Sequence, residues 1–292
     1  MLELHKKNLL KGVKTCKLDF CKFCVLGKQN QVQFKTATHK TEGIMDYVHS
    51  DVWVLVRTAS RGGHMYFVIF IDDFSRKVWV YFMQHKLETF AKFKLWKAKV
   101  ENQTRKKVKC LRTDNGTEYI NDEFKDFCEQ HGIKRHFIVH KTTQQNGVAK
   151  RMNMSIAERV RCLRLNAGLA NILWVDAVSM ACYLINKSPR ATLDGKVAEE
   201  VWTGNEVDYS GLRVFGCPAY VHIPSEERSK LDPKSRQCVF LGCGKGVKGY
   251  KFWDPTANKA VISRDVVFDE NSMLKSTQGK EQQVPESRSS DK

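Results

Sequence analysis

The sequence predicts an α/β protein in which a mixed sheet with helices is followed by a small β-barrel. Over residues 44–165, short apolar runs typical of strands alternate with amphipathic helical patterns. Two further helical segments follow, and from about Leu212 short strand-like runs are separated by Gly, Pro, Asp and Asn. The first three strands have no helix between them, so we expect them to be antiparallel. The later strands alternate with helices, so we expect them to pair in parallel.

The first strand lies in "IMDYVHSDVWV" and ends near Asp51. Residues 66–71 and 77–83 form a predicted hairpin whose turn is "DDFSR". The helix of "LETFAKFKLWKAKVENQ" is expected to bury the apolar positions Phe90, Phe93, Leu95, Trp96 and Val100. A strand in "KKVKCLRTDNG" then leads into a turn.

The segment "NDEFKDFCEQHG" predicts a short helix that is capped by Asn121 and stopped by Gly132. A strand, "IKRHFIVH", precedes the helix "QNGVAKRMNMSIAERVRCLRLNAG", whose apolar stripe is Val148, Met152, Ile156, Val160 and Leu163. Next come a helix ended by Pro189 and a shorter one in "KVAEEVWTG". The predicted barrel strands lie in "LRVFGCPAYVHI", "SRQCVFLGCG", "KGYKFWDP" and "KAVISRDVVFDE".

The composition is that of a globular protein with a large positive charge. Of 292 residues, 42% are hydrophobic and 28% charged, and the formal net charge is +17. Lys and Arg occur in every segment, which favours a polyanionic partner such as nucleic acid; the alternative is a soluble protein with excess Lys. No apolar run reaches 18 residues and no secretory signal is evident, so neither a membrane nor export is expected. The ten scattered cysteines are typical of buried thiols in the cytosol or nucleus.

Two carboxylates stand at predicted strand ends, Asp51 after the first strand and Asp114 after the fourth. If these strands are neighbours, both side chains reach the same edge of the sheet. Paired carboxylates suit Mg²⁺, which prefers oxygen ligands and supports phosphodiester chemistry. The alternative is that Asp114 opens a turn with Asn115 and Gly116.

A C-x-x-C pair, Cys21 and Cys24, has the spacing of half a zinc site. The nearby candidates for further ligands are His5 and Cys16, and their spacing matches no common zinc pattern. Zinc binding by this chain is therefore doubtful.

Several motifs together resemble one family, the integrase region of plant Ty1/copia-type retrotransposon Pol polyproteins. They are "HSDVWV", "FVIFIDDFSRKVWVYFM", "CLRTDNGTEY", "GIKRHF", "QQNGVAKRMN", "ACYLIN", "LRVFGCPAYVHI" and "ISRDVVFDE". The resemblance implies a ribonuclease H-like core, preceded by a zinc-binding region and followed by an SH3-like barrel. On this basis residues 1–38 are expected to be a truncated zinc-binding remnant, 40–205 the catalytic core, 206–272 the barrel and 273–292 a disordered tail.

The family carries an Asp, Asp, Glu triad with 35 residues between its last two acids. By position the first acid is Asp51 and the second Asp114, and 150 − 114 − 1 = 35 brings the third to Lys150, where the family has Glu. An ammonium about 4 Å from a divalent ion is repelled by roughly 8 kcal/mol at an effective dielectric near 20. Val54-Leu55 replaces Gly-Pro and Thr143 replaces Pro, which together with Lys150 suggests a truncated, decaying copy.

Four other acids could stand in for the missing Glu. Glu158 lies eight residues beyond Lys150 on the predicted helix, about 12 Å along its axis, so it is too far. Asp72 and Asp73 are expected to serve the hairpin turn, and Glu118 is expected to face solvent. Replacement of the third ligand by any of these is not expected.

Basic and polar residues around the third position are candidate nucleic-acid contacts because phosphate attracts cations regardless of sequence. They are Lys134, Arg135, Lys141, Gln144, Gln145, Asn146, Lys150, Arg151 and Arg159, with Gln144 to Asn146 expected in a flexible polar loop. The alternative is a solvated helix face.

Three functions remain open at this stage. The resemblance implies Mg²⁺- or Mn²⁺-dependent DNA strand transfer by a nuclear multimer on element ends and target DNA, with a cytoplasmic particle stage. With Lys150 at the third acidic position, catalysis is expected to be impaired. The alternatives are a basic DNA- or RNA-binding module without catalysis, and a decayed fragment without activity.

Overall fold

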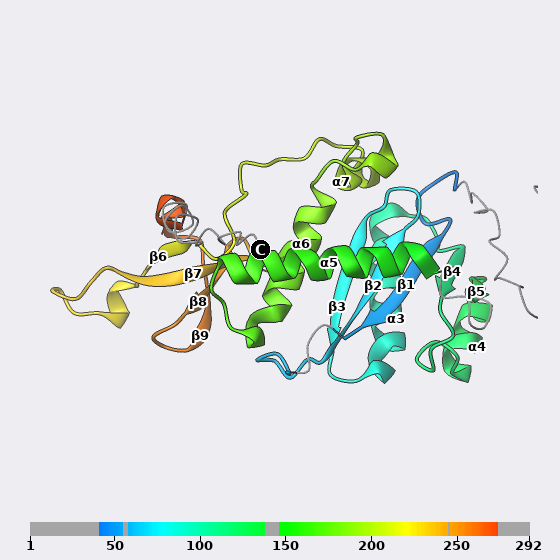
Figure 1. Ribbon diagram of the computed structural model, residues 1–292, viewed down its shortest axis with the longest axis horizontal. Helices are drawn as coiled ribbons and strands as arrows, with labels where there is room; N and C mark the ends of the chain where they lie inside the picture. The colour runs from blue at the N-terminus through cyan, green and yellow to red at the C-terminus, as the bar shows by residue number, and fades with distance from the viewer. Residues whose placement is uncertain (1–40, 55–57, 138–145, 245, 274–292) are drawn as a thin grey trace, which may run out of the picture. The chain divides into compact units, whose positions relative to one another are not determined.

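The computed structural model describes residues 41–54, 58–137, 146–244 and 246–273. Two five-stranded sheets organise this part of the chain (Figure 1). The first has the strand order β3-β2-β1-β4-β5, and the second has the order β10-β6-β7-β8-β9. The predictions for residues 1–38 and for the tail from 274 onward lie outside the described residues.

The first sheet is mixed, as the element order predicts. Its strands are β1 (Val48–Trp53), β2 (Tyr66–Asp72), β3 (Val78–Met83), β4 (Cys110–Thr113) and β5 (Lys134–Phe137). The β1–β2 and β2–β3 pairs are antiparallel, and the β1–β4 and β4–β5 pairs are parallel. Strands β1 and β4 are therefore direct neighbours, which was the condition for bringing Asp51 and Asp114 together.

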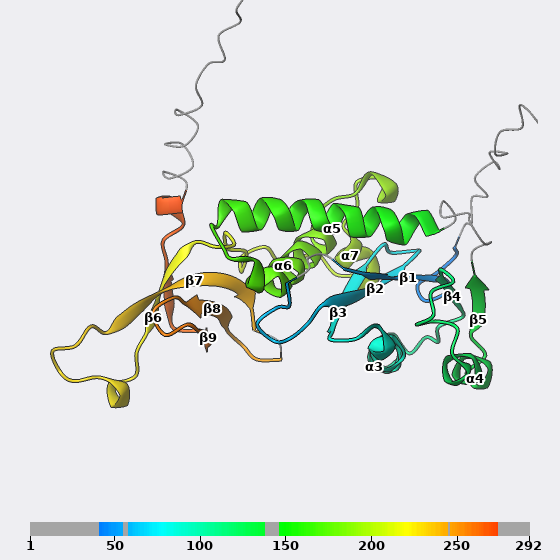
Figure 2. The same ribbon diagram turned by 60° about the horizontal axis from the view of Figure 1, so that its bottom comes forward.

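Helices cover both faces of this sheet. Figure 2 shows α5 (Gly147–Asn166) and α6 (Trp174–Asn186) on one side, and α3 (Thr89–Thr104) and α4 (Asp122–Gln130) on the other. The alternation of β2 divides the core accordingly: Ile69 and Ile71 pack in the cluster that contains α5 and α6 residues, and Val68 and Phe70 pack with α3 residues. The remaining short helices are η1 (Lys86–Glu88), η3 (Asn171–Leu173), η4 (Ala191–Leu193), α7 (Ala198–Thr203) and η5 (Ser225–Glu227).

The predicted helix signals act where expected, with one error. The Asn121 side chain accepts a hydrogen bond from the Phe124 backbone N–H (2.8 Å), and Gly132 adopts φ +65° just after α4. On α3, however, the prediction that Leu95 is buried is wrong, because its side chain is 60% exposed. Leu95 precedes the buried Trp96, so it lies about 100° around the helix from that position.

The second sheet is antiparallel throughout. Its strands are β6 (Pro218–His222), β7 (Ser235–Cys243), β8 (Tyr250–Asp254), β9 (Lys259–Ser263) and β10 (Val266–Phe268). All four predicted strand runs form strands, and "KAVISRDVVFDE" supplies two of them. The exact limits of the domains stay predictions.

The two sheets share one apolar cluster through α5 and α6. Trp174 on α6 and Phe240 on β7 belong to it together with residues of β2. Lys251 on β8 forms an ion pair with Asp176 on α6, and Arg61 stacks over the Trp253 ring at 4.6 Å from its centroid. The β-sheet domain therefore packs against the helices that cover the first sheet.

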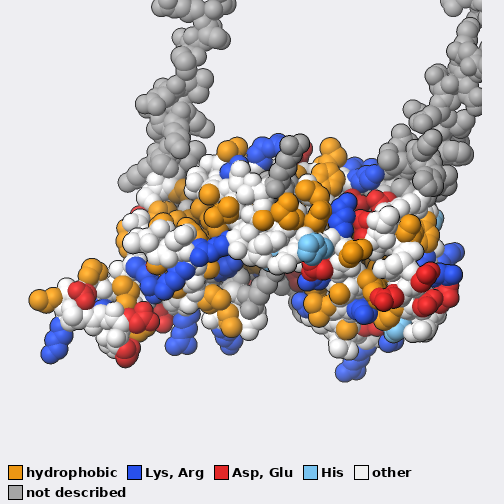
Figure 3. Space-filling view, turned by 90° about the horizontal axis from the view of Figure 1, so that it is seen from below, with side chains coloured by type: hydrophobic (Ala, Val, Ile, Leu, Met, Phe, Trp, Pro, Cys, Tyr) orange, Lys and Arg blue, Asp and Glu red, His pale blue; other side chains and the backbone are white. Residues whose placement is uncertain are grey.

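Basic side chains lie on the surface, and most of the cysteines in the described residues are buried. Lys and Arg side chains are spread across the face shown in Figure 3, with acidic side chains among them. Of the seven cysteines in the described residues, Cys162 and Cys243 are exposed and the other five are buried, all as free thiols. Within the same residues, no helix is long and apolar enough to cross a membrane.

Candidate active site

Asp51 lies in the interior on β1, on the face that α5 covers, and only 4% of the residue is exposed. The amide nitrogen of Asn153 donates to its Oδ2 (2.9 Å), and the amide nitrogen of Asn146 donates to its Oδ1 (3.4 Å). Asn146 is the N-cap residue of α5, and Asn153 lies two turns further along the same helix. Two asparagines from the start of α5 thus hold the first candidate ligand in place.

Asp114 lies beside Asp51 across the parallel β1–β4 pair. The register joins Val48 to Leu111 and His49 to Arg112, an offset of 63 in both cases (111 − 48 and 112 − 49). The same offset joins 51 to 114, and neighbouring strands lie about 4.8 Å apart. Asp114 Oδ1 also accepts from the Gly116 backbone N–H (3.1 Å), so the residue opens a turn at the strand end and faces the site as well.

Lys150 stands on the first turn of α5 and is half-buried. Its charge acts on the Asp51 carboxyl, and so does the charge of Asp114. The three positions predicted from the sequence therefore come from β1, the end of β4 and the start of α5, and they meet at one edge of the sheet. Figure 1 shows α5 passing over this sheet.

The electrostatics of Asp51 follow from this placement. Burial and then the neighbouring Asp114 charge raise its pKa to about 7, while the Asn153 hydrogen bond and the Lys150 ammonium lower it. Part of the Asp51 population is therefore protonated at neutral pH. The ammonium at position 150 offsets part of the repulsion between the two aspartates, which a bound cation would otherwise relieve.

Glu118 corrects one expectation. It is 8% exposed and does not face solvent, and its charge also raises the pKa of Asp51. A Cβ placed on Gly116 would come within 2.6 Å of a Glu118 carboxylate oxygen. The turn after β4 lets this side chain fold back toward the strand end, and glycine at 116 leaves the necessary space. Glu118 thus lies on the same side of the turn as the candidate site.

Asp72 and Asp73 serve the β2–β3 turn, as predicted. Asp72 accepts from the Ser75 backbone N–H (2.8 Å) and from the Met45 backbone N–H (2.8 Å). Asp73 accepts from Arg76 (2.7 Å) and is paired with His49 (2.8 Å). With these contacts formed, both carboxylates are committed to the β2–β3 turn and its surroundings.

The described residues place three carboxylates near this strand end, Asp51, Asp114 and Glu118, because the charges of the latter two act on Asp51. No group of three or more His, Cys, Asp and Glu side chains arranged to hold a metal ion occurs in this part of the chain. Within the described residues, the Oδ1 atoms of Asn146 and Asn153 are buried and accept no hydrogen bond. The site therefore contains two amide oxygens that could serve as metal ligands. Three carboxylates, two amides and one ammonium surround this position, and the ammonium of Lys150 offers no oxygen ligand to a divalent cation.

Of the predicted nucleic-acid contacts, some are exposed, one is half-buried and serves the fold, and others lie outside the described residues. Lys134, Arg151 and Arg159 are exposed. Arg135 is half-buried, donates to the Tyr119 carbonyl (2.7 Å) and stacks over the Phe124 ring, so it serves the fold. Lys141, Gln144 and Gln145 lie outside the described residues, as do Cys21 and Cys24.

Asn146 does not lie in a solvent-facing loop as expected, because it is fully buried against Asp51 and the Ser50 carbonyl. Asn153 was not singled out from the sequence. Its position three residues after Lys150 places it on the same side of the helix, and that spacing was the available signal.

A further basic group lies on the α5 side and was also not predicted. Burial and then the charges of Arg159 and Arg76 lower the pKa of Arg190 to about 10. The Arg190 guanidinium donates to the Met152 sulfur at 3.8 Å. Arg159 and Arg190 therefore form a small region of positive potential on this side, while the Arg76 guanidinium is paired with Asp73.

The fold and this edge define a class: a ribonuclease H-like, retroviral integrase-type core followed by an SH3-like domain. Family models agree, since residues 45–141 match the integrase core domain and residues 217–282 match the retroviral polymerase SH3-like domain. A chain in the structure of a simian T-cell lymphotropic virus intasome in complex with PP2A regulatory subunit B56 gamma has the same fold, with TM-score 0.52, 14% identity, and coverage of 85% of this chain and 88% of that one.

Sequence relatives identify the family within this class. The chain is 46% identical over 270 residues to the retrovirus-related Pol polyprotein from transposon TNT 1-94 of Nicotiana tabacum, covering 92% of this chain and 20% of the relative. It is 33% identical over 251 residues to the Pol polyprotein from transposon RE1 of Arabidopsis thaliana, covering 86% of this chain and 17% of the relative. The chain belongs to the integrase region of the Ty1/copia-type retrotransposon Pol polyproteins, and it spans about a fifth of the length of these relatives.

Proposed function

We propose that this chain acts on DNA as an integrase region whose strand-transfer centre is impaired by Lys150. The observation that carries the proposal is the placement of Lys150: its ammonium acts on Asp51 at the edge where a third carboxylate would stand. A cation there stabilises the ionised Asp51 without offering an oxygen ligand. Lys150 thus acts as an internal counter-ion for the two aspartates.

The reaction of this class is attack of a DNA 3′-hydroxyl on a target phosphodiester. Divalent ions such as Mg²⁺ or Mn²⁺ supply the activation and charge stabilisation that this chemistry needs. In this chain, Asp51 and Asp114 remain in place, held by Asn153 and by the turn at Gly116. We infer that a carboxylate at position 150 is the missing component.

DNA binding does not depend on that component. The exposed side of α5 presents Arg151 and Arg159, and Arg190 lies near enough to Arg159 for their charges to interact. Guanidinium groups bind phosphate through paired hydrogen bonds, and such contacts hold DNA regardless of sequence. A DNA-binding module without catalysis is therefore the second candidate function, and the net charge of +17 favours it.

The assembled form is proposed by analogy. The structurally similar chain belongs to an intasome. We infer that this chain likewise works as a multimer on DNA, in the nucleus where target DNA lies. RNA as a partner remains an open alternative, because phosphate contacts alone do not distinguish the two nucleic acids.

The test compares strand joining by the unaltered chain and by Lys150→Glu, using labelled duplex ends with Mg²⁺ or Mn²⁺. We expect joined products from the variant and not from the unaltered chain. Lys150→Glu with Asp114→Ala is the matched control and should be inactive, because the second ligand is then absent. Activity of the unaltered chain that Asp114→Ala abolishes would contradict the proposed role of Lys150.

A second measurement does not depend on activity. Replacing Lys150 by Glu adds a negative charge beside those of Asp51, Asp114 and Glu118, so we expect a lower melting temperature in the absence of metal. Mg²⁺ should then raise the melting temperature of Lys150→Glu and leave the unaltered chain nearly unchanged, because only the folded variant gains a site. Equal metal responses of the two proteins would show that position 150 does not govern the site.

A further inference from the structure

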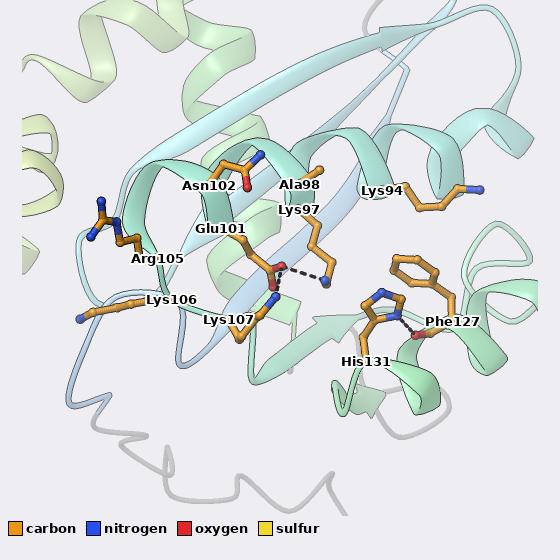
Figure 4. Close-up of a pocket in the computed structure, with 10 residues that line it drawn as sticks. All are labelled: Lys94, Lys97, Ala98, Glu101, Asn102, Arg105, Lys106, Lys107, Phe127 and His131. Atoms are coloured by element: carbon orange, nitrogen blue, oxygen red, sulfur yellow. Dashed lines mark hydrogen bonds and ion pairs between the residues drawn. The ribbon is translucent and has the colours of Figure 1, made fainter.

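A basic groove lies on the face of the first sheet opposite α5, between α3 and α4. It encloses about 610 Å³ and is lined by Lys94, Lys97, Ala98, Glu101, Asn102, Arg105, Lys106, Lys107, Phe127 and His131. Figure 4 shows these residues: five come from α3, and the others come from the turn after it and from the region of α4. The groove is separate from the Asp51 edge, since α3 and α5 pack on opposite sides of β2.

The charge of the groove is one-sided. Five of its ten lining residues are Lys or Arg, and Glu101 is its one carboxylate. Glu101 is already engaged, because it pairs with Lys97 (2.9 Å) and Lys107 (3.4 Å) and accepts from the Val108 backbone N–H (3.0 Å). Burial alone would raise the pKa of Glu101, but these contacts together bring it below its ordinary value. An arriving anion therefore meets an excess of four positive charges.

Part of this charge is fixed in position. Lys97 is buried, it is held by Glu101, and its ammonium lies 5.7 Å from the centre of the Phe127 ring. Figure 4 shows Lys97, Glu101 and Lys107 pointing toward one another at the middle of the groove. Because Lys97 is buried and paired with Glu101, it orders the middle of the groove. The cations that an arriving phosphate can reach are the exposed ones, Lys94, Arg105, Lys106 and Lys107.

The cations are arranged in a row. Lys94 lies near one end of the groove, and Arg105 and Lys106 lie near the other (Figure 4). From position 94 to position 105 the helix extends about 16 Å, the length of roughly five phosphates in one strand of a duplex at 3.4 Å per nucleotide. A row of cations of this length fits a linear chain of phosphates better than it fits a single small anion.

An aromatic pair stands beside this row. The rings of Phe127 and His131 lie 4.0 Å apart at an angle of 30°, and the His131 side chain is hydrogen-bonded to the Phe127 carbonyl (2.8 Å). In grooves that bind single-stranded nucleic acid, bases stack on exposed aromatic side chains beside a row of cations. Here His131 covers part of Phe127, and the exposed His131 ring is the surface on which a base can stack. An acidic peptide would use the cations but would have no comparable need for a stacking surface.

We propose that this groove binds the phosphate backbone of a nucleic-acid segment, separate from any segment held along α5. The proposal stands on the groove alone and does not require strand transfer. It gives the chain two nucleic-acid surfaces on opposite faces of one sheet, so that a single protomer contacts two segments at once.

The test removes charge from the groove and not from its surroundings. Lys94→Gln with Lys107→Gln takes one cation from each part of the row, and both side chains are exposed. Lys99→Gln with Lys125→Gln is the matched control, because these exposed lysines lie on the same two helices but do not line the groove. Binding of a labelled single-stranded oligonucleotide to the full chain is measured by anisotropy across a salt series.

We expect the groove variant to bind more weakly. The slope of log K against log salt should fall by about 1.4, because each phosphate of a single strand that a cation neutralises adds about 0.7 to that slope. The control should keep the slope of the unaltered chain. Glu101→Gln should bind more tightly, since the groove then lacks its carboxylate, and a merely damaged fold would not show this gain. Equal slopes for the groove variant and its control would overturn the proposal.

A local measurement identifies the ligand class. Hydrogen exchange of residues 94–107 and 127–131 is followed with the oligonucleotide, with inorganic pyrophosphate and with a polyglutamate peptide. Protection by the oligonucleotide that disappears in Lys94→Gln/Lys107→Gln supports the proposal. Protection by polyglutamate and not by the oligonucleotide would replace it with an acidic protein partner, and protection by pyrophosphate alone would replace it with a small phosphate ligand.

Discussion

Asp51 shows how one buried carboxyl depends on its neighbours. Its pKa is raised to about 7 by burial and by Asp114, and two asparagine amides donate to its oxygens. A group whose pKa is higher in the folded than in the unfolded state opposes folding once the pH exceeds its unfolded value. For Asp51 that cost develops between about pH 4 and pH 7, and it is complete above pH 7.

Asp51→Asn removes this cost. In metal-free buffer we expect its free energy of unfolding, relative to that of the unaltered chain, to increase by roughly 3 to 4 kcal/mol between pH 4 and pH 8, since each pKa unit is about 1.4 kcal/mol. Urea unfolding at several pH values measures the difference. Asp126→Asn, at an exposed site on α4, controls for the loss of one carboxylate. A difference that is independent of pH would contradict the raised pKa.

Individual residues also mark where sequence reasoning stopped. Asp114 follows β4 as predicted, whereas Asp51 lies within β1, which continues to Trp53. The family spacing located Lys150. Glu118 and Asn146 were expected to face solvent, but the turn at Gly116 and the start of α5 bring both into the interior. Such reversals depend on the path of a turn, which residue type alone does not determine.

At the scale of elements, helix α5 has an apolar face that packs in the core and a basic face that remains exposed. Ala149, Met152, Ile156 and Val160 pack in the core, while Arg151 and Arg159 remain exposed. The helical period thus predicted the packing face and the basic face of α5. On α3, the same reasoning misplaced Leu95, because five apolar residues were assigned to one stripe that accommodates four of them.

Helix α4 provides a test of a local signal. Asn121 accepts from the Phe124 backbone N–H (2.8 Å) and caps the helix that forms one side of the basic groove. We expect Asn121→Ala to lower the free energy of unfolding by about 1 kcal/mol. Asn121→Ser should lower it much less, because serine also caps helices through a side-chain oxygen. Chemical denaturation of the three proteins measures this. If the Ala and Ser variants lose the same amount, the cap does not contribute through its side-chain oxygen.

At the scale of the whole molecule, the two sheets are joined through the end of α5. Gly216, in the segment before β6, adopts φ +84°, and a Cβ there would lie 2.1 Å from the Cβ of Ala167, the residue that follows α5. The shared apolar cluster, which includes Trp174 on α6 and Phe240 on β7, also contains residues of α5. This close approach requires glycine for both its backbone angle and its lack of a side chain.

Gly216→Ala should therefore weaken the packing between the two sheets as well as strain the backbone. The matched control is Gly168→Ala, which has φ +61° but open space around its Cβ. We expect the control to cost about 1 kcal/mol, from backbone strain alone, and Gly216→Ala to cost at least twice that. Thermal unfolding followed by tryptophan fluorescence measures both. Equal losses would mean that Ala167 yields without cost.

The sequence by itself determined the order and type of the elements, the mixed pairing of the first sheet, the family and the two aspartates at its edge. These follow from period, chain order and motif spacing, all of which are local or positional. Only the tertiary structure decided that Asn146, Asn153 and Glu118 surround Asp51, that Arg159 and Arg190 come together beside α5, and that α3 and α4 form a basic groove. Those groupings join residues far apart in the chain, and their contacts depend on how turns close and helices pack.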